Sequence, residues 1–168
     1  MASLSLRGKG IVDFKKDDQY NTTHDIWNTI NHFLPKDKIL FEAFMKDNWS
    51  SKSILSLREL GCNVVGDPTV DFFEKIPEYD ILVSNPPYSI KKKIFERLSV
   101  LNKPFILILP ISTITKQFVK RLERDKLQMI IPQKRMQFEK AGLPLNRCWF
   151  DTCFLCYKME LKQDIIFL

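Results

Sequence analysis

Residues 79–89, which read YDILVSNPPYS, constrain the fold of this chain more than any other stretch. Residues 81–83 form an apolar run without helical spacing, which is typical of a strand buried on both faces. The run ends at two consecutive prolines, and each of them fixes its own φ, lacks an N–H donor and disfavours helix in the residue before it. The sequence therefore predicts a buried strand followed by a stiff corner. If the strand is parallel, the corner lies at its carboxyl end, where open α/β sheets bind their ligands.

The corner offers two hydrogen-bond acceptors beside an aromatic ring. Asn85 Oδ1 and the Pro86 carbonyl can accept both hydrogens of one –NH₂ group, while Tyr88 can stack on the flat ring that carries the amine. A conjugated amine is a poor nucleophile because its lone pair is delocalised, and two acceptors would favour its pyramidal, reactive form. The tetrapeptide alone leaves a second interpretation open, in which Pro86 and Pro87 merely end a strand.

Asn-Pro-Pro-Tyr after a buried strand resembles the catalytic motif of S-adenosylmethionine-dependent amino-methyltransferases. The resemblance covers most of the chain, from about Tyr20 to Met159, and it is greatest to small stand-alone adenine-N6 methyltransferase-like proteins, such as those of large DNA viruses. It implies S-adenosyl-L-methionine as the cofactor and a catalytic set made of Asn85, Pro86, Pro87 and Tyr88. The motif does not fix the substrate, because enzymes that methylate rRNA guanine or a protein glutamine amide look similar there.

Strands and helices alternate along the chain, which predicts a three-layer α/β fold. The resemblance implies a Rossmann-like methyltransferase fold, with a mostly parallel seven-stranded sheet and a C-terminal antiparallel strand pair. We expect residues 1–19 to form a mobile N-terminal arm and residues 20–168 a single methyltransferase-like domain. The expected strands are 39–44, 63–65, 70–73, 81–84, 104–109, 127–132 and 150–159, and the expected helices lie between Thr23 and Pro35 and at 50–60, 91–101 and 115–124.

A nucleotide-type cofactor requires close backbone approach after the first strand and an acidic residue after the second, and Asp67 supplies the latter. The resemblance implies that Glu42 binds the methionine amine of the cofactor. Lys46 and Asn48 stand where the family has the glycines of its turn, so Lys46 either obstructs the cofactor or pairs with its carboxylate. The predicted cofactor-binding residues are Tyr20, Thr22, Glu42, Phe44, Asp67, Asp71, Phe72 and Asn85. A plain helix cap near Thr22 and a core role for Phe72 are the alternatives.

The formal net charge of +6 and the pI near 9.1 favour an anionic partner, with nucleic acid the first candidate and DNA preferred to RNA. The expected phosphate contacts are Lys91, Lys92 and Lys93, which open the helix after Tyr88, and Lys134 and Arg135 before the last strand. The alternative interpretation is that these residues form runs of charge that are exposed to solvent. The loop before the last strand leaves no room for a large recognition domain, so we expect sequence specificity to be slight or to come from a partner subunit, and a homodimer is the other possible assembly.

The remaining features limit the class of protein. No apolar run has membrane-spanning length and residues 1–18 lack an apolar signal region, so we expect an intracellular protein without a membrane partner, cytoplasmic or nuclear in a cell or infected host. Cys153 and Cys156 would point to opposite faces of a strand, so we expect no metal site there and interpret them as core residues.

Three functional hypotheses follow. The first is an S-adenosylmethionine-dependent methyltransferase that acts on an exocyclic amine of a nucleic acid base, with adenine N6 preferred. The second is a catalytically degenerate protein of the same fold that binds nucleic acid or supports a partner subunit, because the glycine turn is lost. The third is a protein glutamine or rRNA guanine N-methyltransferase.

Overall fold

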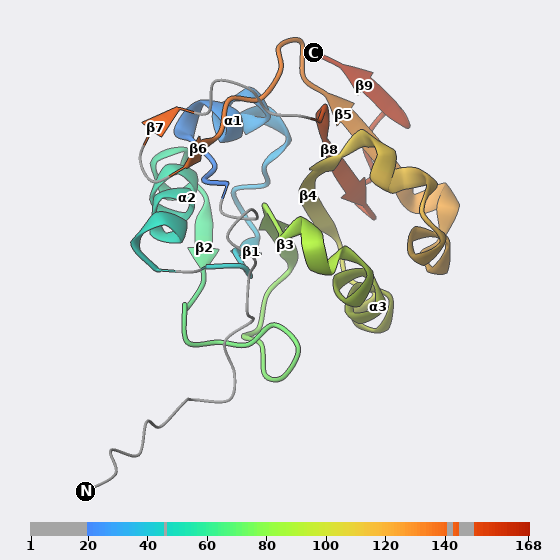
Figure 1. The fold of residues 1–168 in the computed structure, drawn as a ribbon, viewed down its shortest axis with the longest axis horizontal. Coiled ribbons are helices and arrows are strands. Elements are labelled where there is room, and N and C mark those ends of the chain that lie inside the picture. The colour runs from blue at the N-terminus through green and yellow to red at the C-terminus, as the bar shows by residue number, and fades with distance from the viewer. Residues whose placement is uncertain (1–19, 46, 141–142, 145–149) are drawn as a thin grey trace, which may run out of the picture.

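The computed structural model describes residues 20–45, 47–140, 143–144 and 150–168. These residues form a three-layer α/β fold around one seven-stranded sheet (Figure 1). The strand order across the sheet is β2-β1-β3-β4-β8-β5-β9. The strands are β1 (Ile39–Phe41), β2 (Asn63–Val65), β3 (Ile81–Ser84), β4 (Phe105–Pro110), β5 (Leu127–Ile131), β8 (Thr152–Tyr157) and β9 (Ile165–Phe167).

Strand β8 is the one antiparallel member of the described sheet. The pairs β2·β1, β1·β3 and β3·β4 are parallel, β8 is antiparallel to both β4 and β5, and β9 is parallel to β5. The carboxyl ends of β1, β3, β4 and β5 therefore lie along the same edge. The predicted mostly parallel sheet with its antiparallel β5–β8 pair is confirmed.

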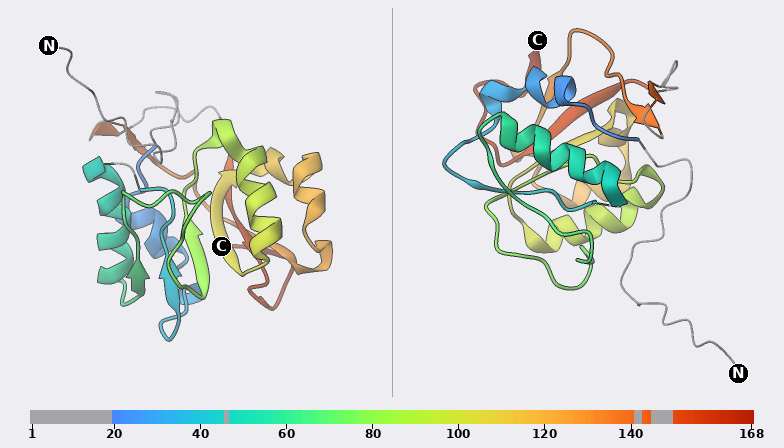
Figure 2. Two further views of the ribbon diagram at one scale, coloured as in Figure 1. Left: turned by 90° about the horizontal axis from the view of Figure 1, so that it is seen from below. Right: turned by 90° about the vertical axis from the view of Figure 1, so that its left-hand side faces the viewer.

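Helices cover both faces of the sheet (Figure 2). On one face lie α1 (His24–Thr29), the short 3₁₀ helix η2 (Asn31–Phe33) and α2 (Asp47–Glu59), and on the other lies α3 (Lys91–Leu101). Trp27 and Leu57 pack with the first face of the sheet, and Phe95 packs with Phe105 on the second. Every residue of β4 and β8 is buried, because the two strands lie between these layers.

Three sequence predictions about these elements are wrong. Residues 70–73 form turns instead of a strand, and the side chain of Asp71 accepts a hydrogen bond from the Phe73 amide. In the helix predicted at 50–60, the apolar residues Ile54, Leu55, Leu57 and Leu60 predict one inward face, but the Leu55 side chain is 55% exposed. Residues 115–124 form no α-helix; the chain from 111 to 126 makes the 3₁₀ turns η4 (Ile111–Thr115), η5 (Gln117–Arg121) and η6 (Arg124–Lys126). Its β-branched residues have low helix propensity.

Two further elements were not predicted. Strand β9 extends the sheet beyond β5, and a small hairpin, β6 (Glu139–Lys140) with β7 (Leu143–Pro144), lies outside the main sheet. Asn21 joins this hairpin through two backbone hydrogen bonds with Glu139, of 2.8 and 3.1 Å. In the part of the chain that the structure describes, no helix combines the length and apolar character needed to cross a membrane.

Candidate functional site

The Asn-Pro-Pro-Tyr corner lies at the carboxyl end of β3, between the ends of β1 and β4. Pro86 and Pro87 are buried, and Tyr88 begins the 3₁₀ turn η3 (Tyr88–Ile90) that leads directly into α3. The predicted position of the corner, after a buried parallel strand, is confirmed. Its polar side chain and its ring are both only partly buried, so they line the exposed edge of the sheet.

Two hydrogen bonds fix the amide of Asn85. Its Nδ2 donates to the backbone carbonyl of Tyr20 at 3.2 Å, and its Oδ1 accepts from the Tyr88 hydroxyl at 3.0 Å. An amide nitrogen only donates and an amide oxygen only accepts, so this pair of partners defines the orientation of the side chain. Oδ1 therefore faces Tyr88. The Tyr88 hydroxyl donates to this oxygen, which is the same atom that would accept a hydrogen from a substrate amine.

Aromatic rings surround this amide. The Tyr20 ring stacks on Tyr88 with centroids 6.1 Å apart and planes at 24°, and Phe150 meets Tyr88 edge-on at 5.2 Å. The Phe138 ring meets the Tyr20 ring edge-on, with the two centroids 6.0 Å apart. Phe138 and Phe150 were not predicted, because the fold brings them to Tyr20 and Tyr88 from far along the chain.

Glu42 is the buried acid of the site. It lies directly after β1 and is 3% exposed. The Ser53 hydroxyl donates to Oε2 at 2.7 Å, and the Ser84 hydroxyl and the Phe44 amide both donate to Oε1. Burial raises the pKa of Glu42 to about 7, against the hydrogen bonds from Ser84, Ser53 and Phe44, which lower it.

The Glu42 network extends to Trp27, whose Nε1 donates to Ser53 Oγ at 2.8 Å. Sequence analysis missed the two serines. Ser84 ends an otherwise apolar strand, and Ser53 shares a helix face with the buried Leu57 four residues later. A polar residue on a buried face is the signal that could have found them.

Five of the predicted cofactor residues gather around one small hollow. Its volume is about 30 Å³, and it is lined by Tyr20, Asn21, Thr22, Glu42, Phe44, Ser53 and Asn85. Pockets that hold small molecules usually measure about 300–1,000 Å³. A ligand of nucleoside size is therefore larger than this hollow.

The other predicted cofactor residues lie outside the hollow. Asp67 is exposed, and hydrogen bonds from the Thr69 hydroxyl and amide to its Oδ1 hold the pKa of its carboxyl below the usual value. Phe72 is buried in the core with its ring 4.9 Å from that of Phe44. Lys46 lies outside the described residues, as does the side chain of Asn48.

Gly66 marks a close approach that sequence analysis did not use. A Cβ placed on it would lie 2.9 Å from the backbone oxygen of Glu42 and 2.7 Å from Ile54 Cδ1. The end of β2 therefore packs directly against the end of β1.

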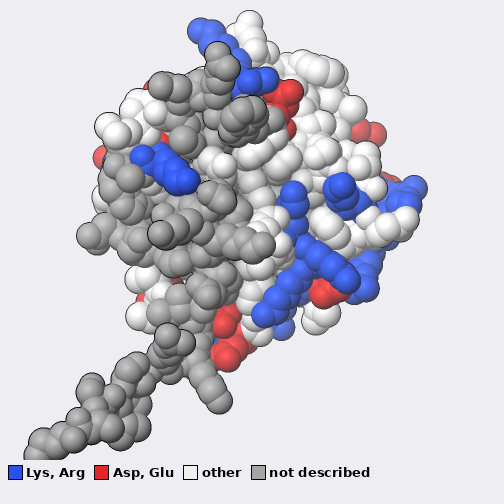
Figure 3. Space-filling model, viewed as in Figure 1, with Lys and Arg blue, Asp and Glu red and all other residues white. Residues whose placement is uncertain are grey.

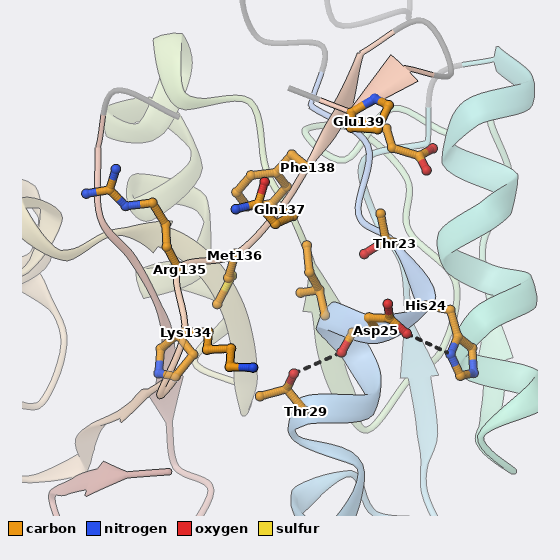
Figure 4. Close-up of a pocket in the computed structure, with 13 residues that line it drawn as sticks. Thr23, His24, Asp25, Thr29, Lys134, Arg135, Met136, Gln137, Phe138 and Glu139 are labelled. Atoms are coloured by element: carbon orange, nitrogen blue, oxygen red, sulfur yellow. Dashed lines mark hydrogen bonds and ion pairs between the residues drawn. The ribbon is translucent and has the colours of Figure 1, made fainter. Parts of the chain in front are cut away.

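The predicted basic residues fall into two separate groups. Lys91 lies with its Nζ 5.6 Å from the Tyr88 ring, and the adjacent Lys92 and Lys93 are exposed. Lys134 and Arg135 instead line a pocket of about 560 Å³ between α1 and the segment after β5 (Figure 4), and Phe138 both lines this pocket and contacts the Tyr20 ring.

Arg135 is paired with Asp151 at 2.7 Å, so part of its charge is already neutralised.

The two cysteines of β8 are buried, and burial raises the pKa of both thiols to about 12. Thiols with such pKa values are protonated at neutral pH and behave as small apolar side chains.

Comparison with known proteins identifies the architecture. No protein-family model and no curated protein matches the chain. Among solved structures, it is similar to a candidate RNA methyltransferase from Pyrococcus horikoshii, with a TM-score of 0.50, 11% identity, and coverage of 89% of this chain and 92% of that chain. The chain has a Rossmann-like methyltransferase fold.

Two more solved structures align with lower scores. A precorrin-6y C5,15-methyltransferase from Geobacter metallireducens matches 84% of this chain and 93% of its own, with a TM-score of 0.46 and 11% identity. TrmN from Thermus thermophilus matches 80% of this chain and 48% of its own, with a TM-score of 0.40 and 12% identity. At these identities the likeness describes the methyltransferase fold, and the roles of residues rest on the geometry of the site.

Proposed function

We propose that this chain is an S-adenosyl-L-methionine-dependent methyltransferase that acts on an exocyclic amine of a nucleic acid base, with adenine N6 as its target. The observation that carries the proposal is the fixed amide of Asn85, whose Oδ1 faces Tyr88 at the carboxyl end of β3 while Nδ2 is held by the Tyr20 carbonyl. This geometry presents a hydrogen-bond acceptor beside an aromatic ring, as the chemistry of a planar amine requires.

The corner residues act on the amine and its ring. Asn85 Oδ1 and the Pro86 carbonyl accept the two amine hydrogens, which favours the pyramidal nitrogen that attacks. Tyr88 stacks on the flipped base, and its hydroxyl must first release Oδ1. Because positive charge develops on the nitrogen, both acceptors bind the transition state more strongly than the substrate.

Glu42 and its neighbours suit the methionine end of the cofactor. When bound, S-adenosylmethionine supplies a methyl group on a positively charged sulfur. Glu42 offers a buried carboxyl group for the cofactor's ammonium, and Tyr20, Thr22 and Phe44 line the same hollow. A nearby cation would lower the pKa of Glu42 and keep it ionised. Asp67 would bind the ribose hydroxyls and Asp71 the adenine, whereas Phe72 is buried and takes the core role.

DNA is the substrate that we propose, and the contacts to it come from Lys91, Lys92 and Lys93, beside Tyr88, and from Lys134 and Arg135. The exposed lysines of the first turn of α3 support this, because they lie where phosphates next to a base on Tyr88 would be. Phosphates would also offset the unfavourable placement of cations at a helix N-terminus.

The small volume of the hollow favours one alternative, a catalytically degenerate protein that binds nucleic acid without the cofactor. Calorimetric titration with S-adenosylhomocysteine separates the two hypotheses. Binding supports an enzyme whose hollow opens, whereas no binding at any tested concentration supports the degenerate protein.

Transfer of a tritiated methyl group to adenine-containing DNA and RNA oligonucleotides tests the reaction. Asn85→Ala should lower turnover by a factor on the order of a hundred, comparable to the loss of one preorganised polar partner, with affinity for S-adenosylhomocysteine little changed. Asn28→Ala, an exposed position on α1, is the matched control and should keep wild-type turnover.

Tyr88 variants separate its ring from its hydroxyl. Tyr88→Ala should weaken substrate use, because base stacking contributes about 1–3 kcal/mol. Tyr88→Phe should keep or raise activity, since it removes the hydroxyl that occupies Asn85 Oδ1. Normal turnover in Asn85→Ala, with an active wild type, would reduce the corner to a structural turn.

A further inference from the structure

The charges of this chain are strongly polarised along the sequence. Residues 20–90 carry ten Asp and Glu against six Lys and Arg, a formal net charge of −4. Residues 91–140 carry thirteen Lys and Arg against four Asp and Glu, a formal net charge of +9. The overall charge of +6 is therefore concentrated in the part of the chain that forms α3, β4, η4–η6 and β5.

The fold gathers many of these cations on one side of the molecule. η5 packs against α3, and Arg121 on η5 pairs with Glu96 on α3 at 3.6 Å. Figure 3 shows Lys and Arg side chains gathered over α3 and the adjoining turns, with few acidic side chains among them. We call this the α3-side basic surface, and its members are Lys92, Lys93, Lys116, Lys120, Arg121 and Arg124, all exposed.

Three members of this surface are absent from the predicted nucleic-acid residues and are not neutralised within the protein. Among the described residues, no acidic side chain forms an ion pair with Lys116, Lys120 or Arg124. Grouped cations without partners repel one another, so an external polyanion would stabilise the surface. The turns follow β4, whose carboxyl end lies next to the corner at the end of β3, so the surface begins beside the site.

We propose that the α3-side basic surface binds the sugar-phosphate backbone of a single-stranded nucleic acid and leads it past Tyr88. The inference rests on the proposed function, since it identifies where the substrate of that site lies. Lys91, above the Tyr88 ring, connects the surface to the corner. Residues 20–90 carry a net negative charge, so the strand should be attracted more to the α3 side than to the part of the chain that forms β1 and β2.

Fluorescence anisotropy with short labelled DNA and RNA strands of the same sequence, without cofactor, tests the surface directly. The test variant is Lys116→Glu with Lys120→Glu. The control is Lys38→Glu with Lys162→Glu, which makes the same change of net charge at exposed lysines that precede β1 and β9, at the opposite sheet edge. Circular dichroism checks that both variants are folded.

The test variant should weaken binding of both strands about tenfold or more and reduce the slope of log K against log salt by roughly 1.5, at about 0.7–0.9 per lost phosphate contact. The control should change the slope little. Equal weakening by both pairs would show a general charge effect and overturn the inference. Binding to anionic phosphatidylserine vesicles, with no binding to either strand, would also overturn it.

The outcomes separate this inference from the proposed function. If the surface binds nucleic acid but no methyl group is transferred, the surface stands and the methyltransferase proposal fails. If methyl transfer occurs and the test variant binds and methylates like the control, the reaction stands and the substrate takes another path.

Discussion

Glu42 carries an ionisable group into a buried position beside the Asn-Pro-Pro-Tyr corner. Ser53, Ser84 and the Phe44 amide all donate to it, yet burial still raises its pKa to about 7. Near neutral pH the side chain therefore exists in both protonation states, and a bound cation would favour the charged one. Glu42 therefore couples the stability of the protein to pH.

Glu42→Gln should remove a pH dependence of stability. The folded-state pKa lies above the ordinary value of 4.5, so the folded protein binds more protons between these values and stability falls as pH rises from about 4.5 to 7. The loss amounts to roughly 3 kcal/mol above pH 7. Urea unfolding at several pH values should show a flatter profile in Glu42→Gln, with higher stability than wild type at high pH.

The control for this prediction is Glu78→Gln, an exposed acid that precedes β3. Its pH profile should follow that of the wild type. A Glu42→Gln profile that remains as steep as the wild type between pH 5 and about 7 would contradict the predicted linkage.

At the scale of elements, sequence analysis succeeded where a segment's own residues determine its structure. The buried strand β3, helix α3 and the strand pair β5–β8 have apolar patterns and boundaries that are local. The strand prediction for residues 70–73 was wrong because Phe72 packs against Phe44 in the core, while Asp71 accepts a hydrogen bond from the backbone of a turn. The short segment β9 forms a strand by pairing with the edge of β5, which its own sequence does not indicate.

The same limit applies to the site. The corner at Asn85 was predictable from adjacent residues, whereas the partners of Glu42 come from β3 and α2 and those of Tyr88 from segments before α1 and before β8. Such partnerships depend on the packing of elements, which periodicity does not encode.

Gly66→Ala should destabilise the contact between the ends of β1 and β2. The added methyl group would meet the backbone oxygen of Glu42 at 2.9 Å, and a backbone atom moves less readily than the tip of a side chain. We expect a loss of about 1–3 kcal/mol in the free energy of unfolding, as for overpacked sites. Chemical denaturation measures it.

Gly61→Ala is the comparison, because no atom lies within 4 Å of its added Cβ and only the positive φ of 82° opposes it. Its cost should be about 1–2 kcal/mol, from the left-handed conformation alone, and it should leave S-adenosylhomocysteine binding unchanged. Wild-type stability in Gly66→Ala would show that the contact between β1 and β2 rearranges at little cost in free energy.

At the scale of the whole molecule, the layers predict a gradient of stability across the sheet. Strands β4 and β8 are buried throughout and are paired on both sides, while β9 lies at the edge with Phe167 78% exposed. Amide hydrogen exchange should therefore be slowest in β3, β4 and β8 and fastest in β9. Exchange in residues 105–110 as fast as in 165–167 would contradict this arrangement.

The place of β8 between β4 and β5 also determines the order in which the protein can fold. β5 precedes β8 in the chain, yet it pairs with β8 and not with β4, so it cannot join the growing sheet until residues 152–157 have arrived. Closing the long intervening loop costs chain entropy before any strand pairing compensates for it. During synthesis, the apolar residues of β4 and β5 would wait exposed for their common partner, which makes this interval the one in which the nascent chain is most prone to aggregate.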